Sequence, residues 1–309
     1  MSQAGKLYID NRDAFATYGL VILEGGYDSL VQFPPMKAVD YVDWPEEDGI
    51  EPDLLNPVLD AKEGIVLRCA CVRSPQQENL FSDLQTGAYH TFDFRRIGVT
   101  ALLRLNEVSN LEIVGTLATF TMSLSFDADF VTDFEHYEGV PSILSFNSNK
   151  LEFDGNLMLF VDYEGSGGGH FINVRSFGCK IDNVDVSSYG IIPLEGDIEA
   201  IARQDVIKQN LKISSKYIGG QTYDGQNVRK KERDVALRFL MRASIPSLFW
   251  AQYKRFLTDL VAPGNRVLQY GGKTIKFFYK SQTVDEFSVA YDNSVWCEFT
   301  LNVCFYEGD

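Results

Sequence analysis

Histidines, which serve as acid-base catalysts and metal ligands, are few in this chain of 309 residues and stand far apart. The three are His90, His136 and His170. None sits in a metal-ligand spacing, and none stands beside a Gly-x-Ser-x-Gly turn that would present a serine nucleophile. The pattern indicates neither a metal centre nor a serine hydrolase.

The cysteines favour a structural role. They number five, with no Cys-x-x-Cys pair and no histidine close by in the sequence: Cys69, Cys71, Cys179, Cys297 and Cys304. Cys69 and Cys71 stand two apart on a predicted strand, so they share a face but cannot easily form a disulfide with each other. We expect reduced, buried thiols.

Two further patterns could carry chemistry. Glu46-Glu47-Asp48 is the densest acidic cluster, but a catalytic pair needs carboxylates held at a fixed separation on rigid elements, and this cluster lies in a proline-rich loop. The glycine run at residues 165–169 has no lysine or helix start after it, so we interpret it as a hinge and not as a phosphate-binding loop. The sequence therefore predicts no catalytic residues, no metal, no cofactor and no enzymatic activity.

A strand pattern occurs twice in the chain. Phe120–Phe126 reads Phe-Thr-Met-Ser-Leu-Ser-Phe, and Phe299–Phe305 reads Phe-Thr-Leu-Asn-Val-Cys-Phe. Both alternate apolar with smaller or polar side chains, which is the period of a strand with one buried face. Five more pairs recur in one order: Ile9-Asp10-Asn11 with Ile181-Asp182-Asn183, Tyr18-Gly19 with Tyr189-Gly190, Leu23-Glu24-Gly25 with Leu194-Glu195-Gly196, Asp48-Gly49 with Asp224-Gly225, and Ile65–Arg68 with Val235–Arg238.

The repeat predicts two copies of one domain, at residues 1–132 and 171–309, joined by a connector at 133–170. Aromatic residues make up 13% of the chain, with 22 Phe and 15 Tyr, many in alternating runs, which favours strands over helices. We expect a mainly β protein, a β-barrel or β-sandwich with one short helix in each copy.

The same order of strands and helices is predicted in each copy. The helices begin at Ser74-Pro75 and at Ser244-Ile245-Pro246, and end near Gln85 and at Pro263-Gly264. A strand, a turn and a second strand are expected over residues 7–24. The other predicted strands are 64–72, 88–94, 100–105, 111–126, 267–270, 274–280, 288–291 and 299–305.

Two long segments interrupt the copies, at residues 29–60 and 197–233. The first is too broken by proline for a central strand, and insertions of this length in a compact domain commonly serve as interaction arms. We expect both to extend and reach neighbouring molecules, so that deleting residues 36–57 would leave a folded monomer that assembles poorly. The connector is expected to hold a hairpin around Asp154-Gly155.

Charge is unevenly distributed along the chain. The net charge is −15, made up of −11 in residues 1–132, −6 in 133–170 and +2 in 171–309. An acidic chain argues against tight binding to nucleic-acid phosphates, which needs clustered Lys and Arg. No apolar run is long enough for a membrane span and no signal-peptide core is found at the N-terminus, so we expect synthesis in the cytoplasm.

The duplicated order of strand pair, long arm, central strand, capped helix and closing strands resembles the tube-type β-barrel of tailed-phage tails and contractile injection systems. The resemblance rests on Tyr18-Gly19, residues 44–49, Ser74-Pro75 and the Phe120 strand, with their second-copy partners. Within that group it is most similar to distal tail proteins and tandem-barrel tube or hub proteins. The resemblance implies a virion structural protein, made in the host bacterial cytoplasm, that forms a ring at the distal end of the tail tube or baseplate hub.

The resemblance also implies partners. The chain would self-associate as a trimer of tandem barrels or as a hexamer, contact neighbouring tail tube and baseplate proteins, and let DNA pass through an acidic or neutral lumen without specific binding. Two other interpretations stay open. One is a non-catalytic β-barrel module that binds carbohydrate or protein, for which Tyr41 and Trp44 are the candidate contacts, and the other is a hydrolase or another enzyme.

Overall fold

The computed structural model describes residues 4–72, 76–133, 135–136, 144–146, 149–154, 157–162, 174–194, 196–203, 205–208, 212–217, 219–223, 228–290 and 293–308. Within these residues the chain is mainly β, as the sequence predicts. Its helices are α1 (Ala14–Tyr18), α2 (Asp28–Val31), α3 (Gln76–Leu84), α4 (Phe130–Asp133), the 3-10 helix η1 (Val186–Tyr189), α5 (Asp197–Ala202) and α6 (Pro246–Leu260).

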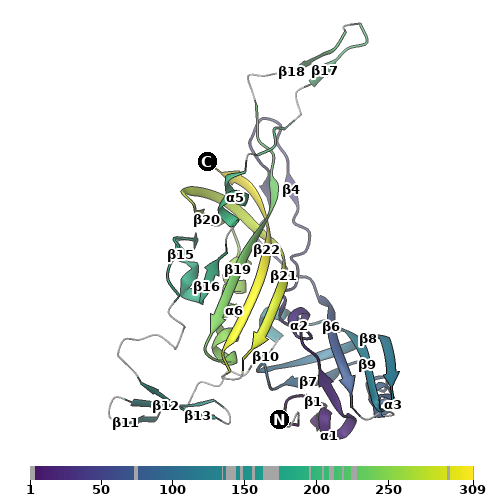
Figure 1. The fold of residues 1–309 in the computed structure, drawn as a ribbon. Coiled ribbons are helices and arrows are strands. Elements are labelled where there is room, and N and C mark those ends of the chain that lie inside the picture. Colours follow the sequence, from purple (N-terminus) through teal and green to yellow (C-terminus); the bar gives the residue numbers. More distant parts are fainter. Residues whose placement is uncertain are drawn as a thin grey trace.

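The first half of the chain forms one curled antiparallel sheet with the strand order β2-β1-β7-β8-β9-β6-β3, and β10 pairs with β8 (Figure 1). Alternate residues of β9 are buried, because this strand lies between two others and covers the core with one face. The strands are β1 (Tyr8–Ile9), β2 (Arg12–Asp13), β3 (Leu20–Ile22), β6 (Lys62–Cys71), β7 (His90–Phe94), β8 (Val99–Val114), β9 (Leu117–Phe126) and β10 (Glu135–His136).

The second half repeats this topology, with the order β15-β14-β20-β21-β22-β19-β16. Since β9 lies between β8 and β6, and β22 between β21 and β19, the repeated strands hold equivalent places, which confirms that prediction. The strands are β14 (Lys180–Ile181), β15 (Val184–Asp185), β16 (Ile191–Pro193), β19 (Arg233–Ala243), β20 (Arg266–Tyr270), β21 (Lys273–Val289) and β22 (Val295–Gly308). Each order is a path with two ends, so the described strands form curled sheets and not a hydrogen-bonded closed ring.

The first turn of each half is copied in atomic detail. Asp10-Asn11 and Asp182-Asn183 all have positive φ, a left-handed conformation that Asp and Asn tolerate better than most residues. Asp10 Oδ1 accepts a hydrogen bond from the Thr91 amide at 2.9 Å, and Asp182 Oδ1 accepts one from the Val267 amide at 2.8 Å. The turn thereby fixes the first hairpin against β7 or β20.

The helices of the two halves are also anchored alike. Tyr18, at the end of α1, donates its hydroxyl to Asp83 of α3 at 2.6 Å, and Tyr189, at the end of η1, donates to Asp259 of α6 at 2.5 Å. These tyrosines belong to the repeated Tyr-Gly pairs. The predicted similar packing of the two main helices is therefore confirmed.

Strand boundaries differ from prediction in three places. Residues 7–24 contain α1 between β2 and β3, because Asp13 caps a helical turn by accepting from the Ala16 amide. The predicted strand 111–126 is divided by a turn at Gly115, where φ is +63°. The separate strands predicted at 274–280 and 288–291 are one long strand, β21.

The connector forms a small sheet of its own, in the order β11 (Leu144–Phe146), β12 (Asn149–Asp154) and β13 (Leu157–Asp162). The expected hairpin joins β12 and β13, while β11 pairs with the outer edge of β12. The Ser74-Pro75 helix start, Gly155, the glycine hinge at 165–169, His170 and Asp224-Gly225 lie outside the described residues.

The two halves share one continuous apolar core. The Phe33 ring stacks near the Tyr253 ring, with centroids 4.1 Å apart. The Trp250 indole of α6 donates to the Ile97 carbonyl at 2.6 Å, so the longest helix of the second half is tied to the first. The repeated sheets are therefore joined by packing as well as by the connector.

The two arms behave differently. The first arm, residues 36–59, carries the short hairpin of β4 (Tyr41–Val42) and β5 (Glu51–Pro52), and the second arm, residues 207–230, carries β17 (Lys212–Ser214) and β18 (Gln221–Tyr223). Figure 1 shows β17 and β18 projecting away from the rest of the chain. The first arm packs on the second half of its own chain. That either arm reaches other molecules stays a prediction.

Candidate functional site at the junction of the two arms

The arms leave their sheets through the same backbone pattern. An isolated antiparallel bridge joins Met36 to Leu59 at the root of the first arm, and another joins Ile207 to Lys230 at the root of the second. Both spans are equal, since 59 − 36 and 230 − 207 are 23. Adding 171, which is 207 − 36, converts a first-arm number into its second-arm counterpart.

This equivalence relates Lys37 to Lys208 and Gly49 to Gly220. Both lysine amides donate across the root, at 2.8 Å and 2.7 Å, and both glycines have a left-handed φ, of 68° and 87°. Gly219-Gly220 is therefore the structural counterpart of Asp48-Gly49. The sequence matches Asp48-Gly49 to Asp224-Gly225 instead, a pair that lies outside the described residues.

An apolar cluster holds the first arm on the second half. Ile50 and Leu54 of the arm pack on Phe278 of β21 and on Cys304 and Tyr306 of β22, and all five are buried. Gly264, after α6, donates its amide to the Leu54 carbonyl at 2.8 Å. Burial of these side chains stabilises the docked arm, since a fully buried Leu or Ile side chain contributes about 1.5–3 kcal/mol.

Lys208, at the root of the second arm, is enclosed by the tip of the first. Its side chain is 4% exposed, and Nζ donates to the Trp44 carbonyl at 3.0 Å, to the Gly49 carbonyl at 2.5 Å and to the Asp43 carboxylate. A buried ammonium is tolerated when its protons find acceptors and its charge a partner. Lys208 thereby fastens the two arms together.

Gly49 lets the tip of the first arm approach β22 closely. A Cβ at this position would lie 1.4 Å from the Tyr306 carbonyl oxygen. The Gly49 amide donates to the Lys230 carbonyl at 2.9 Å, and the Lys230 amide donates to Asp48 Oδ1 at 2.6 Å. The root ladder of the second arm is thus extended by the first arm.

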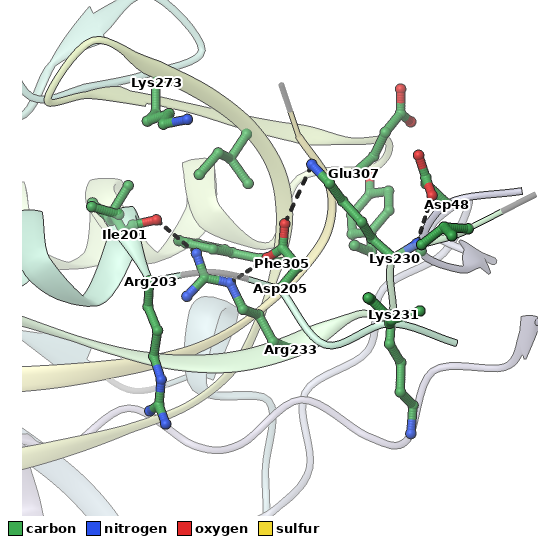
Figure 2. Close-up of a pocket in the computed structure, with 16 residues that line it drawn as sticks. Asp48, Ile201, Arg203, Asp205, Lys230, Lys231, Arg233, Lys273, Phe305 and Glu307 are labelled. Carbon is green, nitrogen blue, oxygen red and sulfur yellow. Dashed lines mark hydrogen bonds and ion pairs between the residues drawn. The ribbon is translucent and has the colours of Figure 1, made fainter. Parts of the chain in front are cut away.

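A cavity of ≈ 450 Å³ opens beside this junction, between both arms and the ends of β21 and β22 (Figure 2). At its centre Arg233 pairs with Asp205 at 2.8 Å and donates to the carbonyls of Ala200 and Ile201 at 2.7 Å each. Five basic and three acidic residues line the cavity. The main arginine of the cavity is thus held by partners within the chain.

The second arm offers exposed apolar side chains beyond its root. Ile213 is 70% exposed and Tyr217 is 84% exposed. Ile207, at the root, is half exposed. Side chains of this kind on a projecting hairpin are available for a partner molecule.

Most side chains with catalytic or ligand chemistry have structural roles here. His90 is buried, with Nδ1 2.6 Å from Asp10 Oδ2 and Nε2 3.1 Å from the Leu84 carbonyl. Glu46-Glu47-Asp48 lies at the first arm tip, where the Asp48 carboxylate accepts a hydrogen bond from the backbone amide of Lys230. Across the part of the chain that the structure describes, no three His, Cys, Asp or Glu side chains form a group that could hold a metal ion.

The five cysteines are free and buried, which confirms that prediction. Burial raises the pKa of Cys71 to about 11 and that of Cys304 to about 12, so these thiols stay protonated and unreactive at neutral pH. Cys304 lies directly beneath the first arm.

Sequence reasoning missed the residues that matter most at the junction. Lys208 and Lys230 stand in a polar segment whose composition is that of an ordinary loop. Lys208 is equivalent to Lys37, and Lys230 to Leu59, when the two arms are aligned at equal length. The match of Asp48-Gly49 to Asp224-Gly225 hid this alignment because it requires a gap. A comparison of the two segments without a gap would have found it.

No protein-family model matches this chain, and no curated protein matches it in sequence. Among solved structures, the chain is similar to SPP1 Dit (gp 19.1), whose crystal structure is described as a paradigm of the hub adsorption apparatus in phages that infect Gram-positive hosts. The identity is 9%, the TM-score is 0.30, and the match covers 98% of each chain. In the described part of this chain, no helix has both the length and the apolar character to cross a membrane.

Proposed function

We propose that this chain is a structural, non-catalytic subunit of a phage tail or phage-like injection system, in which copies assemble into a ring at the distal end of the tail tube or baseplate hub. The observation that carries the proposal is the arm junction within the repeat. The first arm crosses from the first half and packs on the second, whereas the second arm, which has the same length, projects away from the rest of the molecule. A unit built in this way associates head to tail, which generates closed rings or filaments.

The stoichiometry follows from having two similar halves in each chain. Three copies would supply six sheets and form a trimer with pseudo-six-fold symmetry, and a hexamer that uses one half of each chain for the ring is the alternative. The halves carry net charges of −11 and +2, which suits neighbours that meet through unlike surfaces. The lumen would be acidic or neutral, so that passing DNA is not retained.

Electron microscopy of negatively stained protein, together with mass photometry, tests this function. We expect rings with a central hole and a mass of three chains, or of six for the alternative, in the protein alone or with neighbouring tail tube and baseplate proteins. A strictly monomeric particle at micromolar concentration, with no ring in the presence of those neighbours, would exclude it.

A binding module for carbohydrate or protein is the second candidate. The observation in its favour is that Tyr41 and Trp44 of the first arm are 58% and 47% exposed, with the Trp44 indole held by Glu51 at 3.0 Å. Aromatic faces of this kind stack on sugar rings. Glycan binding that is lost on Tyr41→Ala and Trp44→Ala, in a protein that stays monomeric, would favour this candidate over the ring.

A further inference from the structure

The second arm projects in the single chain, although its root has the same backbone bridge and the same spacing as the root of the docked first arm. We infer that the second arm of one copy docks on the first half of a second copy, where Lys37 donates to backbone carbonyls at the second-arm tip as Lys208 donates to those of Trp44 and Gly49 within one chain. The inference deepens the proposed function and rests on it, because this contact would link neighbouring copies.

The surface for this docking is identified by the repeat. The β8–β9 pair has a register shift between Leu105 and Glu107, and the β21–β22 pair has one between Tyr279 and Ser281, at equivalent places. The registers relate the three residues beneath the first arm to three on the first half: Phe278 to Arg104, Cys304 to Ser125 and Tyr306 to Asp127.

Compared with the junction within one chain, both surfaces of the proposed contact are polar instead of apolar. On the first half, Arg104 binds Asp127 in a two-point contact at 2.7 Å and 3.0 Å, and Asn106 donates to Ser125 at 2.7 Å. This patch is polar where its counterpart is apolar. On the arm, Gln221 is the equivalent of Ile50, so a polar residue would meet the polar patch as an apolar residue meets the apolar one.

A polar version of the contact is suited to a separate chain. The apolar cluster beneath the first arm is covered as soon as one chain folds, whereas a surface that awaits a second copy must remain soluble when uncovered. Polar and charged groups also give orientation and a fast association rate. The difference between the two patches is therefore what one expects of one docking mode used once within a chain and once between chains.

The net charges of the two partners are opposite. Residues 203–233, which contain the second arm, hold eight basic and three acidic residues, a net charge of +5. Residues 1–132 have a net charge of −11. Attraction between these surfaces steers a second copy toward the arm and weakens as salt is added.

The tip of the second arm has the same backbone conformation at its glycine as the docked tip of the first arm, but within the described part of the chain it packs against no strand of the two large sheets. Gly220 has a left-handed φ of 87°, as Gly49 has, but a Cβ at Gly220 would find nothing within 4 Å, whereas at Gly49 it would meet Tyr306. Lys37 is exposed, whereas Lys208 is buried because the first-arm loop that precedes Gly49 covers it. One chain thus contains both surfaces of a second junction, the second-arm tip and the region around Lys37, and these surfaces do not contact each other.

Crosslinking between separately labelled chains tests the contact. Ala38→Cys in one full-length chain and Ser215→Cys in another would be mixed with a short bismaleimide, since Ala38 is exposed beside Lys37 and Ser215 is the counterpart of Trp44, whose carbonyl accepts from Lys208. The five native cysteines are buried and give little background. We expect at least about tenfold more two-chain product than from Ala38→Cys mixed with Ser188→Cys, a control on the exposed face of η1. Equal yields would overturn the inference.

Removal of the ammonium group supplies a second readout. Lys37→Met should weaken self-association, measured by mass photometry at low salt, by about tenfold or more, because the carbonyls at the second-arm tip lose their donor. Lys180→Met removes the same charge at an exposed position on β14 and should stay within about threefold of wild type. Equal weakening would count against the contact. Rings that form without the 38–215 crosslink would overturn this inference and leave the proposed function intact. The crosslink without rings would support this inference and overturn the proposed function.

Discussion

The ammonium group of Lys208 lies 2.5 Å from the carbonyl oxygen of Gly49, although the two residues are 159 positions apart in the sequence. This bond joins the root of the second arm to the tip of the first. It helps to hold the first arm of the repeat on the second half, and the proposed head-to-tail association rests on this arrangement.

Removing the ammonium group should loosen this junction. Lys208→Met leaves the carbonyls of Trp44 and Gly49 without their donor, and a buried polar group without its partner costs about 1–3 kcal/mol. The free energy of unfolding, measured with urea, should fall by that amount. Lys37→Met is the matched control at the equivalent, exposed position and should change it by less than about 0.5 kcal/mol. Equal losses would show that the junction contributes nothing specific.

Gly49→Ala should lift the tip of the first arm, because the new Cβ would meet the Tyr306 carbonyl oxygen at 1.4 Å. Cys304 is buried beneath this arm, and its burial raises the pKa to about 12, so alkylation of this thiol by maleimide reports on lifting. We expect Cys304 to react about tenfold faster in the variant, with Cys297 still protected. Gly220→Ala, which has the same left-handed strain without the clash, should leave Cys304 unreactive.

Shortening the arms should have opposite outcomes. Replacing residues 38–57 with a two-residue turn removes Ile50 and Leu54 from the apolar cluster, and loss of one such buried side chain costs about 2–5 kcal/mol. The melting temperature of the monomer should therefore fall, in contrast to the stable monomer that the sequence predicts for a deletion of 36–57. The equivalent replacement of 209–228 should leave the melting temperature unchanged and reduce self-association.

Lys62 should make stability depend on pH. Its side chain is buried, its Nζ donates to the Leu30 carbonyl and lies 4.7 Å from the centre of the Phe130 ring, and burial holds its pKa well below the usual value. In the unfolded chain the pKa is about 10.4. Between the two values the unfolded state binds the extra proton, so stability rises with pH across this window.

Lys62→Met should remove that rise. From neutral pH to pH about 10, the unfolding free energy of the wild type should rise by more than about 1 kcal/mol relative to that of the variant, since one pKa unit corresponds to about 1.4 kcal/mol. Lys180→Met, at an exposed position, should retain the wild-type pH profile. Urea denaturation at a series of pH values measures both, and parallel profiles for wild type and Lys62→Met would contradict the prediction.

Local patterns were sufficient for much of the fold. The alternation in Phe120–Phe126 and Phe299–Phe305 predicts two strands that hold equivalent places, and the apolar spacing after Ser244 predicts α6, because strand and helix periods are properties of short segments. The helix α1 was missed because one capping residue, Asp13, outweighs the apolar run around it. The division into domains at 132 and 171 stays a prediction.

The sequence by itself determined the β class and the duplication, whereas the equal length of the arms became clear from the bridges at their roots. Tertiary structure alone decided that Lys208 is buried and Lys37 exposed, although they are the same residue at the same place in the repeat. The reason is that burial depends on what another segment brings to a side chain. The tip that encloses Lys208 is held in place because Ile50 and Leu54 find apolar partners in Phe278 and Tyr306 of the same chain, and Lys37 meets no such tip within one chain.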